Sequence, residues 1–239
     1  MYTMKILITG TSSGIGKALA QQLINQHHQV LGISRRKSAN NFKSLRIDLS
    51  QPGVWEKVAR TLKKQQFLPK VIIFNAGIND NDLDPDYDPK VTRQIFEINF
   101  FSILDGIKTL SYYLPRNTHF ITISSTSAFK GSGLEGVGYA SSKAALSVAF
   151  ESLYHYFKNR FIFTTVYLGP VDSGMRLNRA KTPLILSEQK AVSIIIQAIK
   201  NKQPTYYVPN ILFLFIRIMK LFPANIYLKI FPILERRYR

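Results

Sequence analysis

The chain contains no cysteine among its 239 residues, so disulfides, thiolate metal sites and a cysteine nucleophile are all excluded. Acidic residues are also scarce. The sequence has 14 Asp and Glu against 32 Lys and Arg, which gives a formal net charge of +18. Such an excess favours anionic partners. However, the cations are scattered and form no basic stripe interleaved with aromatics, so we do not expect a nucleic-acid partner.

Long apolar runs are missing as well. The N-terminal "MYTMKILITG" leads directly into a strand-like segment, so we expect no signal peptide and a cytoplasmic location. In residues 209–239 the apolar runs reach only about ten residues, whereas a membrane-spanning helix needs about 20. The sequence therefore predicts no spanning helix in this region.

Residues 1–208 alternate between apolar, β-branched runs and helix-length amphipathic segments, a pattern typical of βαβ units. The predicted strands are Lys5–Thr9, Val30–Ile33, Leu45–Ile47, Val71–Phe74, His119–Ile123, Phe161–Tyr167 and Tyr206–Val208. The predicted helices are Gly14–His27, Pro52–Gln66, Pro89–Leu114, Tyr139–Lys158 and Ser187–Lys200, with Ser50 and Ser187 as helix-start signals. We expect one doubly wound (Rossmann) three-layer α/β domain over 1–208, with a mostly parallel sheet of seven strands, and a C-terminal extension over 209–239.

The segment "NDNDLDPDYD" (79–88) holds five of the 14 acids and superficially resembles a calcium loop. It has no Gly at the sharp-turn position and no Glu twelve places from Asp80. We therefore interpret it as a solvated loop and expect no metal site.

A glycine-rich turn follows the first strand in "ILITGTSSGIGKALAQQL" (6–23). Gly10, Gly14 and Gly16 let the backbone turn tightly and approach a ligand closely. The helix that begins near Gly14 directs free N–H groups and the positive end of its dipole at the turn, which favours an anion. In an open α/β sheet the expected anion is the pyrophosphate of a dinucleotide.

The stretch "GYASSKAAL" (138–146) places Tyr139 and Lys143 four residues apart on a predicted helix, where they share a face. A nearby ammonium lowers the pKa of a tyrosine towards the range useful for proton transfer. Tyr154 and Lys158 have the same spacing but lie near the far end of the same helix. Ligands in open α/β sheets bind where the helices begin, so we favour Tyr139 and interpret Tyr154, Tyr156 and Phe157 as core or subunit-contact residues.

Several motifs occur in a fixed order along the chain: Thr9-Gly10-x-x-x-Gly14-Ile15-Gly16, "DLS" (48–50), "NAG" (75–77), Asn99, "ISS" (123–125), Tyr139-x-x-x-Lys143 and "LGPVDSGM" (168–175). Together they resemble the short-chain dehydrogenase/reductase family over about residues 4 to 208. The resemblance implies an oxidoreductase that transfers hydride between a nicotinamide cofactor and a carbonyl or alcohol.

The resemblance also implies roles for individual residues. Tyr139 would be the general acid/base, and Lys143 would tune it while binding the nicotinamide ribose. Ser125 would bind the substrate oxygen, and Asn99 would hold a water in the proton relay. Ser125 precedes Tyr139 by 14 residues, whereas the usual gap in the family is 13, so Ser124 and Thr126 remain alternatives. The cofactor would contact Gly10, Thr11, Ser12, Ser13, Gly14, Ile15, Gly16, Ser34, Arg35, Arg36, Asp48, Leu49, Asn75, Ala76, Gly77, Tyr139, Lys143, Pro170, Val171 and Ser173.

The second predicted strand is followed by "GISRRK" (32–37), which contains no acid. A carboxylate after this strand usually binds the ribose hydroxyls of NAD, whereas an arginine accommodates the 2′-phosphate of NADP. Ser34, Arg35 and Arg36 therefore predict NADP(H) over NAD(H).

The extension 209–239 mixes apolar and aromatic residues with cations and has Glu235 as its single acid. This composition suits the interface of an anionic membrane, which would place the protein on the inner face of a membrane. A tail that covers the substrate cleft or contacts a partner subunit is the alternative. Either environment favours a hydrophobic carbonyl or alcohol substrate.

The family resemblance also implies a homodimer or homotetramer formed through the helices at 89–114 and 139–158. The competing functional hypothesis is a non-catalytic dinucleotide-binding sensor or scaffold.

Overall fold

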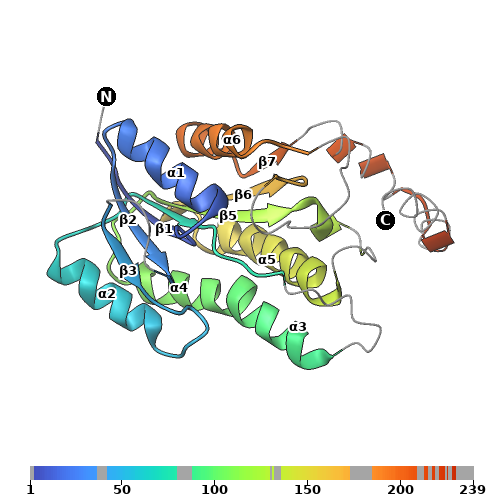
Figure 1. Ribbon diagram of the computed structural model, residues 1–239, viewed down its shortest axis with the longest axis horizontal. Coiled ribbons are helices and arrows are strands. Elements are labelled where there is room, and N and C mark those ends of the chain that lie inside the picture. Colours follow the sequence, from blue (N-terminus) through green and yellow to red (C-terminus); the bar gives the residue numbers. More distant parts are fainter. Residues whose placement is uncertain are drawn as a thin grey trace.

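The computed structural model describes residues 3–36, 42–79, 88–129, 131, 136–172 and 185–208, and in the extension 213–214, 217–218, 221–223, 225 and 228–229. Its centre is a seven-stranded sheet of order β3-β2-β1-β4-β5-β6-β7, in which every neighbouring pair is parallel (Figure 1). The strands are β1 Lys5–Thr9, β2 Gln29–Ser34, β3 Ser44–Arg46, β4 Val71–Phe74, β5 Thr118–Ser125, β6 Phe161–Leu168 and β7 Thr205–Val208.

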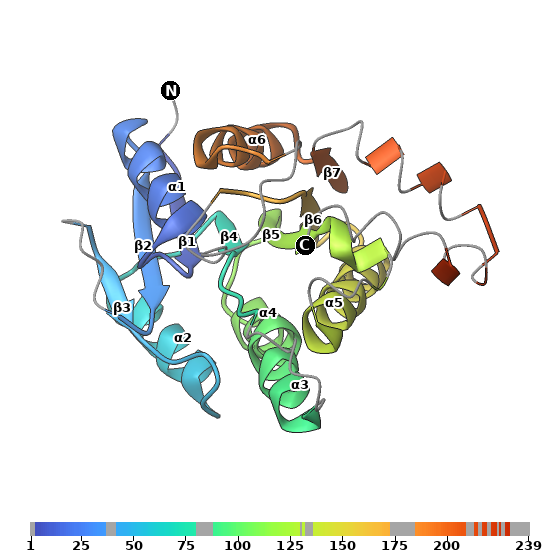
Figure 2. The same cartoon turned by 45° about the vertical axis from the view of Figure 1, so that its right-hand side comes forward.

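Helices cover both faces of this sheet, as Figure 2 shows from a second side. They are α1 Gly14–Asn25, α2 Val54–Lys64, α3 Pro89–Phe96, α4 Ser102–Ser111, α5 Val137–Tyr156 and α6 Glu188–Asn201. Helices α1 and α6 pack on one face, and α2, α4 and α5 pack on the other. The expected doubly wound three-layer fold with seven parallel strands is confirmed.

Burial on both faces explains why the strands are almost continuously apolar. Successive side chains of a strand point to opposite faces. In β1, Ile6 and Ile8 pack towards α1 and α6, whereas Leu7 packs towards α2 and α4. All three are fully buried. The central strands therefore carry apolar residues at most positions, as in other parallel sheets of α/β proteins.

The ends of several predicted elements shift by one or two residues, and the following differences bear on the site or on helix starts. The helix expected over 89–114 is interrupted by a π-helical turn, Glu97–Phe101, between α3 and α4. Ser50 is not a helix cap, because its N–H and hydroxyl both donate to Asp48 Oδ1 and α2 begins after Gly53. Helix α5 begins at Val137, two residues earlier than expected. The prediction for Ser187 is confirmed, since its side chain accepts a hydrogen bond from Lys190 N–H at the start of α6.

His119 is a buried titratable group near the start of β5. Its Nε2 lies 2.7 Å from Thr164 Oγ1, and that hydroxyl donates to the carbonyl of Gln203. Because the hydroxyl hydrogen is used in this way, Nε2 carries the imidazole hydrogen. Nδ1 has no hydrogen-bond partner among the described residues. Burial, assisted by the charge of Lys202, lowers the pKa of His119 to about 3.

This depressed pKa predicts a pH-dependent stability. Below about pH 6.5, His119 becomes protonated in the unfolded chain. In the folded chain its imidazole stays neutral until the pH reaches about 3. The contribution of neutral His119 to the free energy of unfolding is complete above about pH 6.5. It decreases as the pH falls, by up to about 1.4 kcal/mol per pH unit for one proton. Urea unfolding of the wild type and of His119→Asn between pH 6.5 and about 4 should show a steeper fall for the wild type. If the free energy of unfolding fell equally with pH in both proteins, the lowered pKa of His119 would be contradicted.

Candidate active site

A cleft of about 520 Å³ opens at the edge where the strands have their carboxyl ends. Most of the residues that we predicted for the site line it: Gly10, Ser12, Ser13, Gly14, Ile15, Gly16, Ser34, Arg35, Arg36, Asp48, Leu49, Asn75, Ala76, Gly77, Ser125, Tyr139, Lys143, Pro170 and Val171. Thr11 and Asn99 are fully buried and are not among the lining residues. Ser173 and most of the acidic segment 79–88 lie outside the described residues.

The glycine-rich turn forms one wall of the cleft through backbone that side chains would block. Gly10 has a left-handed φ of 77°, and a Cβ there would lie 2.8 Å from the Cα of Ala76. A Cβ on Gly16 would collide with the carbonyl of Gly10. Helix α1 starts here, and its N-cap residue, Ser13, makes no side-chain capping hydrogen bond. The first N–H groups of α1 are therefore presented to the cleft at the positive end of the helix dipole.

Asn75 fixes this turn from the neighbouring strand. Its Nδ2 donates to the carbonyls of Thr9 and Gly10, at 3.1 and 3.3 Å. In return, Thr9 Oγ1 accepts hydrogen bonds from the N–H groups of Asn75 and Ala76. The ends of β1 and β4 are thus locked together. Thr11 lies beneath the turn against Gly32, where a Cβ would collide with its Oγ1, so it supports the turn from behind.

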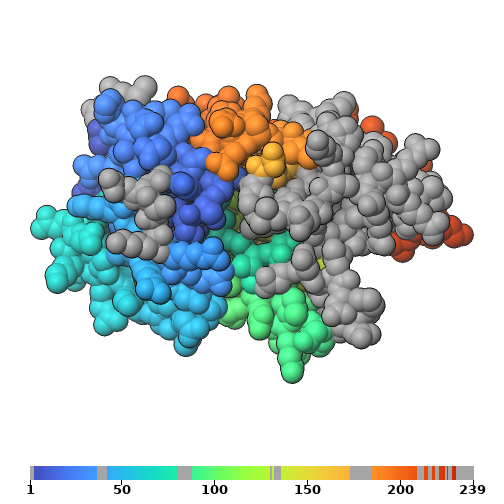
Figure 3. Space-filling view, viewed as in Figure 1, coloured from blue at the N-terminus to red at the C-terminus, as the bar shows by residue number. Residues whose placement is uncertain are grey.

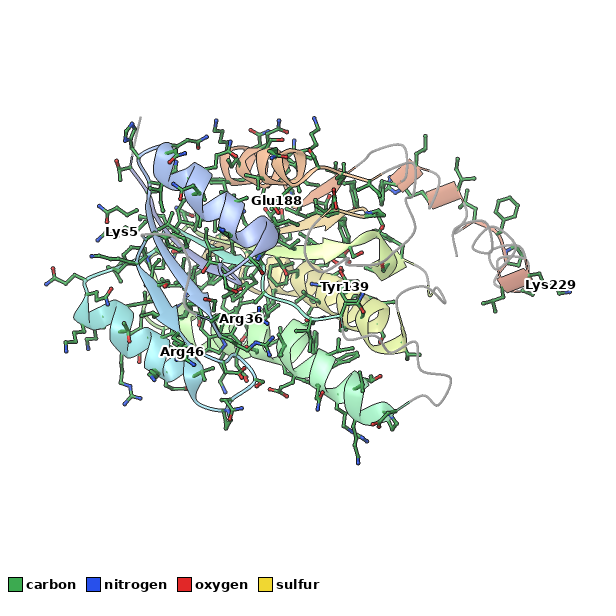
Figure 4. The ribbon with its side chains drawn as sticks, viewed as in Figure 1. Lys5, Arg36, Arg46, Tyr139, Glu188 and Lys229 are labelled. Carbon is green, nitrogen blue, oxygen red and sulfur yellow. The ribbon has the colours of Figure 1, made fainter. Side chains whose placement is uncertain are left out.

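The segment after β2 brings two cations to the far end of the cleft. Arg35 and Arg36 are exposed and line the cavity. Ser34 Oγ donates to the carbonyl of Arg36 at 2.6 Å, and Arg46 Nε donates to the carbonyl of Arg35. These bonds hold the backbone that carries both guanidinium groups. In Figure 4, Arg36 lies on the β2–β3 side of this edge and Tyr139 lies on the α5 side.

Asp48 lies near these arginines, at the end of β3. Hydrogen bonds from Ser50 and the charge of Arg35 hold its pKa below the usual value, with the bond from the Ser50 backbone as the largest cause. Asp48 is therefore ionised at neutral pH. Its Oδ1 is already occupied by the N–H and hydroxyl of Ser50. Among the described residues, no hydrogen bond is made to its other oxygen, Oδ2.

Lys143 is the buried charge of the site. Only 5% of its surface is exposed, and its Nζ donates to the carbonyl of Ile123 at 2.8 Å. The Nζ lies 5.8 Å from the ring centroid of Tyr139. Burial lowers the pKa of Lys143 to about 8, so the ammonium form still predominates at neutral pH. A Cβ on Gly77 would lie 3.5 Å from this Nζ, so the missing side chain leaves space beside the ammonium.

A close helix contact sets the position of Tyr139. Gly138 allows the start of α5 to approach α3, because a Cβ there would lie 2.8 Å from Ile95 Cδ1.

Tyr154, in contrast, is 43% exposed and does not line the cleft. It lies 15 residues further along α5, or roughly 22 Å at about 1.5 Å per residue. Tyr156 is 81% exposed, so neither tyrosine is a core residue, whereas Phe157 packs partly buried against the core.

Asn99 joins three elements inside the protein. Its Oδ1 accepts from Ile78 N–H, and its Nδ2 donates to the carbonyl of Ile78 and to Ser142 Oγ. The side chain therefore ties the segment after β4 to α5. It lies in the π-helical turn, a feature that often marks functional sites.

The hydroxyls at the end of β5 face different partners. Ser124 Oγ lies 2.9 Å from Ser147 Oγ and 3.4 Å from the carbonyl of Lys143, so it contacts α5. Ser125 Oγ accepts from the N–H of Ser127 and lies 2.9 Å from Ser127 Oγ. Both Ser124 and Ser125 line the cleft, but Thr126 does not.

Sequence reasoning missed the apolar lining of the cleft. It consists mainly of residues adjacent to predicted ones at strand ends, namely Ile33, Ile47, Ile78, Ile98, Ile123, Leu168 and Gly169. The signal was available, since the last residue of each parallel strand reaches the same edge. An elongated cleft with an open helix start, two guanidinium groups and apolar walls fits a nicotinamide dinucleotide.

Comparison with known proteins agrees with this geometry. The family model for short chain dehydrogenase matches residues 4–183. A 3-ketodihydrosphingosine reductase from Bacteroides thetaiotaomicron is 33% identical over 158 residues, which is 64% of this chain but only 58% of that relative's length. Among solved structures, a short chain dehydrogenase from Burkholderia cenocepacia in complex with NADP has a TM-score of 0.71 at 21% identity, with 86% of this chain and 87% of that one covered. A 4-hydroxyisoleucine dehydrogenase complexed with NADH has a TM-score of 0.73 at 18% identity, with 85% and 96% covered.

The two structures share the fold, and one carries NADP where the other carries NADH. The family model spans three quarters of the chain, from the start of the sheet to beyond β6. The chain therefore belongs to the short-chain dehydrogenase family and is an oxidoreductase of that family.

Proposed function

We propose that the protein is an NADP(H)-dependent oxidoreductase that interconverts a carbonyl and an alcohol, with Tyr139 as the general acid/base. The observation that carries the proposal is the placement of Tyr139 on the wall of the cleft with the buried ammonium of Lys143 beside its ring. When bound, the nicotinamide supplies or accepts the hydride. The protein must then supply or accept the proton at the substrate oxygen.

Lys143 makes this proton transfer possible near neutral pH. An unperturbed tyrosine has a pKa near 10, which is too high for an efficient base. A positive charge in a water-poor environment stabilises the phenolate more strongly than it would in bulk water. The pKa of Lys143, about 8, keeps the ammonium form predominant at neutral pH. In the direction of carbonyl reduction, Tyr139 donates its hydroxyl proton to the substrate oxygen.

Ser125 is the hydroxyl that we propose to bind the substrate oxygen. The N–H of Ser127 donates to Ser125 Oγ on the wall of the cleft, whereas Ser124 Oγ is occupied by contacts to α5. Asn99 acts in our proposal by positioning α5 relative to the segment after β4, because its side chain bonds Ile78 and Ser142. A water relay beside Asn99 stays a prediction.

We propose NADP(H) as the cofactor because Arg35 and Arg36 reach the cleft and the segment after β2 carries no acid. A guanidinium group binds a phosphate through paired N–H donors, whereas a carboxylate there would repel it. Ser13–Gly16 would bind the pyrophosphate at the start of α1. Asp48 would accept a hydrogen bond from the adenine amine.

A hydrophobic carbonyl or alcohol is the proposed substrate class, supported by the apolar side chains that line the cleft, among them Ile78, Ile98 and Val171. The relative from Bacteroides thetaiotaomicron is named as a reductase of a sphingoid ketone, which is such a compound. The competing proposal, a non-catalytic sensor, would leave the proton-transfer residues without a use.

We also propose a homodimer or homotetramer formed through α4 and α5. Large apolar or aromatic side chains are strongly exposed here: Tyr112 at 74% and Tyr113 at 55% directly after α4, and Val137 at 56%, Val148 at 61% and Tyr156 at 81% on α5. A second copy would bury them in a symmetric contact.

Replacing Tyr139 with Phe should lower kcat by about 10² to 10⁴, because the proton donor is lost while the ring remains. The matched control is Tyr154→Phe, which changes the other tyrosine of a Tyr-x-x-x-Lys pair and should keep wild-type activity. NADPH oxidation over a panel of hydrophobic aldehydes and ketones measures both variants, and fluorescence titration measures NADPH binding. Tight NADPH binding by the wild type without turnover of any panel member would favour the sensor.

Ser125→Ala should lower kcat by about 10² to 10³, since one hydrogen bond to the developing oxyanion is removed. Ser124→Ala serves as the control and should retain activity within about tenfold, because its hydroxyl contacts α5. Steady-state kinetics with one substrate of the panel compares the two. If Ser124→Ala were the more damaged variant, the assignment of Ser125 would be wrong.

Replacing Arg35 and Arg36 together with Ser should weaken NADPH binding roughly 10- to 100-fold, which corresponds to loss of charge-assisted hydrogen bonds to one phosphate. NADH binding should change little, because NADH lacks that phosphate. Arg60→Ser, an exposed change on α2, controls for the general loss of positive charge. Fluorescence titrations give the Kd of each cofactor, and an equal loss for NADPH and NADH would refute the 2′-phosphate site.

A further inference from the structure

The first described residues of the extension fold back onto the sheet through an aromatic stack. The ring of Phe213 lies parallel to that of Tyr207 on β7, with centroids 3.5 Å apart and planes 15° apart. Tyr207 in turn stacks on Tyr167 of β6 at 4.9 Å. Phe129, at the end of the 3₁₀ turn η2 (Thr126–Phe129), contacts all three rings. Phe213 is only 8% exposed, so this contact is a genuine docking point.

Arg217 closes the stack from outside. Its guanidinium carbon lies 4.6 Å from the ring centroid of Phe213 and 5.8 Å from that of Tyr207. A cation over an aromatic face is attracted by the ring quadrupole. Phe213 and Arg217 therefore anchor the extension beside β7. They also fix the place from which its remaining side chains project.

Beyond this anchor, the described apolar side chains of the extension face solvent. Their exposed fractions are large: Leu214 54%, Ile218 48%, Leu221 84%, Phe222 44% and Leu228 66%. None of them lines the cleft. Figures 1 and 2 both place these segments beyond β7, and Figure 3 shows their red atoms at the margin of the molecule. We call Leu214, Ile218, Leu221, Phe222 and Leu228, together with Arg217 and Lys229, the tail surface.

The charge of the extension limits what can cover this surface. Residues 209–239 contain six Lys and Arg and one acid, Glu235. Arg217 and Lys229 are exposed among the apolar side chains, and Figure 4 shows Lys229 at the outer margin of the molecule, far from Tyr139. A symmetric contact with a second copy would bring two such cationic segments together, and like charges oppose that contact.

The described helices also limit how a membrane could be engaged. None of the helices in the described part of the chain is long and apolar enough to cross a bilayer. Short apolar stretches with aromatics and cations instead suit the boundary between headgroups and acyl chains. Anionic headgroups attract Lys and Arg close to the surface.

We propose that the tail surface binds the surface of an anionic lipid bilayer, with its leucines and Phe222 inserted among the acyl chains and its cations among the headgroups. The stack of Phe213 on Tyr207 then attaches the catalytic domain to the bilayer. This proposal concerns attachment and does not depend on the chemistry proposed for Tyr139.

The test uses the full chain and two kinds of vesicle, phosphatidylcholine alone and phosphatidylcholine mixed with phosphatidylglycerol. The wild type should co-sediment with the mixed vesicles at least about tenfold more strongly than with the neutral ones, and added salt should weaken this binding. The double variant Leu221→Glu, Phe222→Glu should lose at least about tenfold in partitioning, because two inserted side chains become anionic.

The matched control is Leu68→Glu with Gln65→Glu, which adds the same charge at two exposed positions that lie outside the extension and outside α4 and α5. It should bind mixed vesicles like the wild type. Thermal melts of all three proteins verify folding, since every replaced side chain is exposed. The proposal is overturned if the wild type does not co-sediment with the mixed vesicles, or if both double variants bind these vesicles equally well. Light scattering gives the oligomeric state of each protein. If only the tail variant dissociates into monomers while its vesicle binding is unchanged, the tail surface binds a second copy of the chain and the proposal is overturned.

Discussion

The edge formed by the carboxyl ends of the parallel strands constrains everything else in this protein. Because all seven strands run in one direction, the segments after β1, β2, β4, β5 and β6 emerge side by side. Residues that are far apart in sequence, such as Gly10, Ser125 and Pro170, therefore line one cleft. Apolar residues on both faces of the strands keep this edge rigid. The site can then be built from short segments whose origins are fixed.

Buried and partly buried polar groups tie these segments to one another. Asn75 bonds the turn after β1, Asn99 bonds the segment after β4 to α5, and Lys143 bonds the end of β5. A buried polar group without a partner is costly, so each of these bonds opposes alternative arrangements of its segment. Lys143 is the extreme case, because an ammonium loses hydration here and gains the carbonyl of Ile123. The lowered pKa of Lys143 reflects this loss of hydration. The proposed chemistry at Tyr139 uses the charge that remains.

Local patterns predicted the strands and the glycine-rich turn, and placed the start of α5 within two residues, because each depends on residues close in sequence. The π-helical turn around Asn99 could not be predicted in this way, since its partners, Ile78 and Ser142, lie 21 and 43 residues away. Ser50 failed as a helix cap for a different, local reason. Asp48 binds it first, and Gly53 supplies the left-handed residue before α2. The proposal of Ser125 over Ser124 uses the position of α5, which spacing along one strand does not contain.

The extension shows how one set of rings can serve two parts of the molecule. Phe129 ends the turn that follows Ser125, and it packs against the same rings that hold Phe213. The anchor of the extension and the segment of the proposed catalytic hydroxyl therefore share one aromatic cluster. A bilayer bound to the tail surface would lie beside β7, at one side of the carboxyl edge. An apolar substrate would be concentrated in that bilayer, at the surface to which the protein is attached. The proposed membrane attachment and the proposed hydrophobic substrate thus support each other physically, although each rests on different residues.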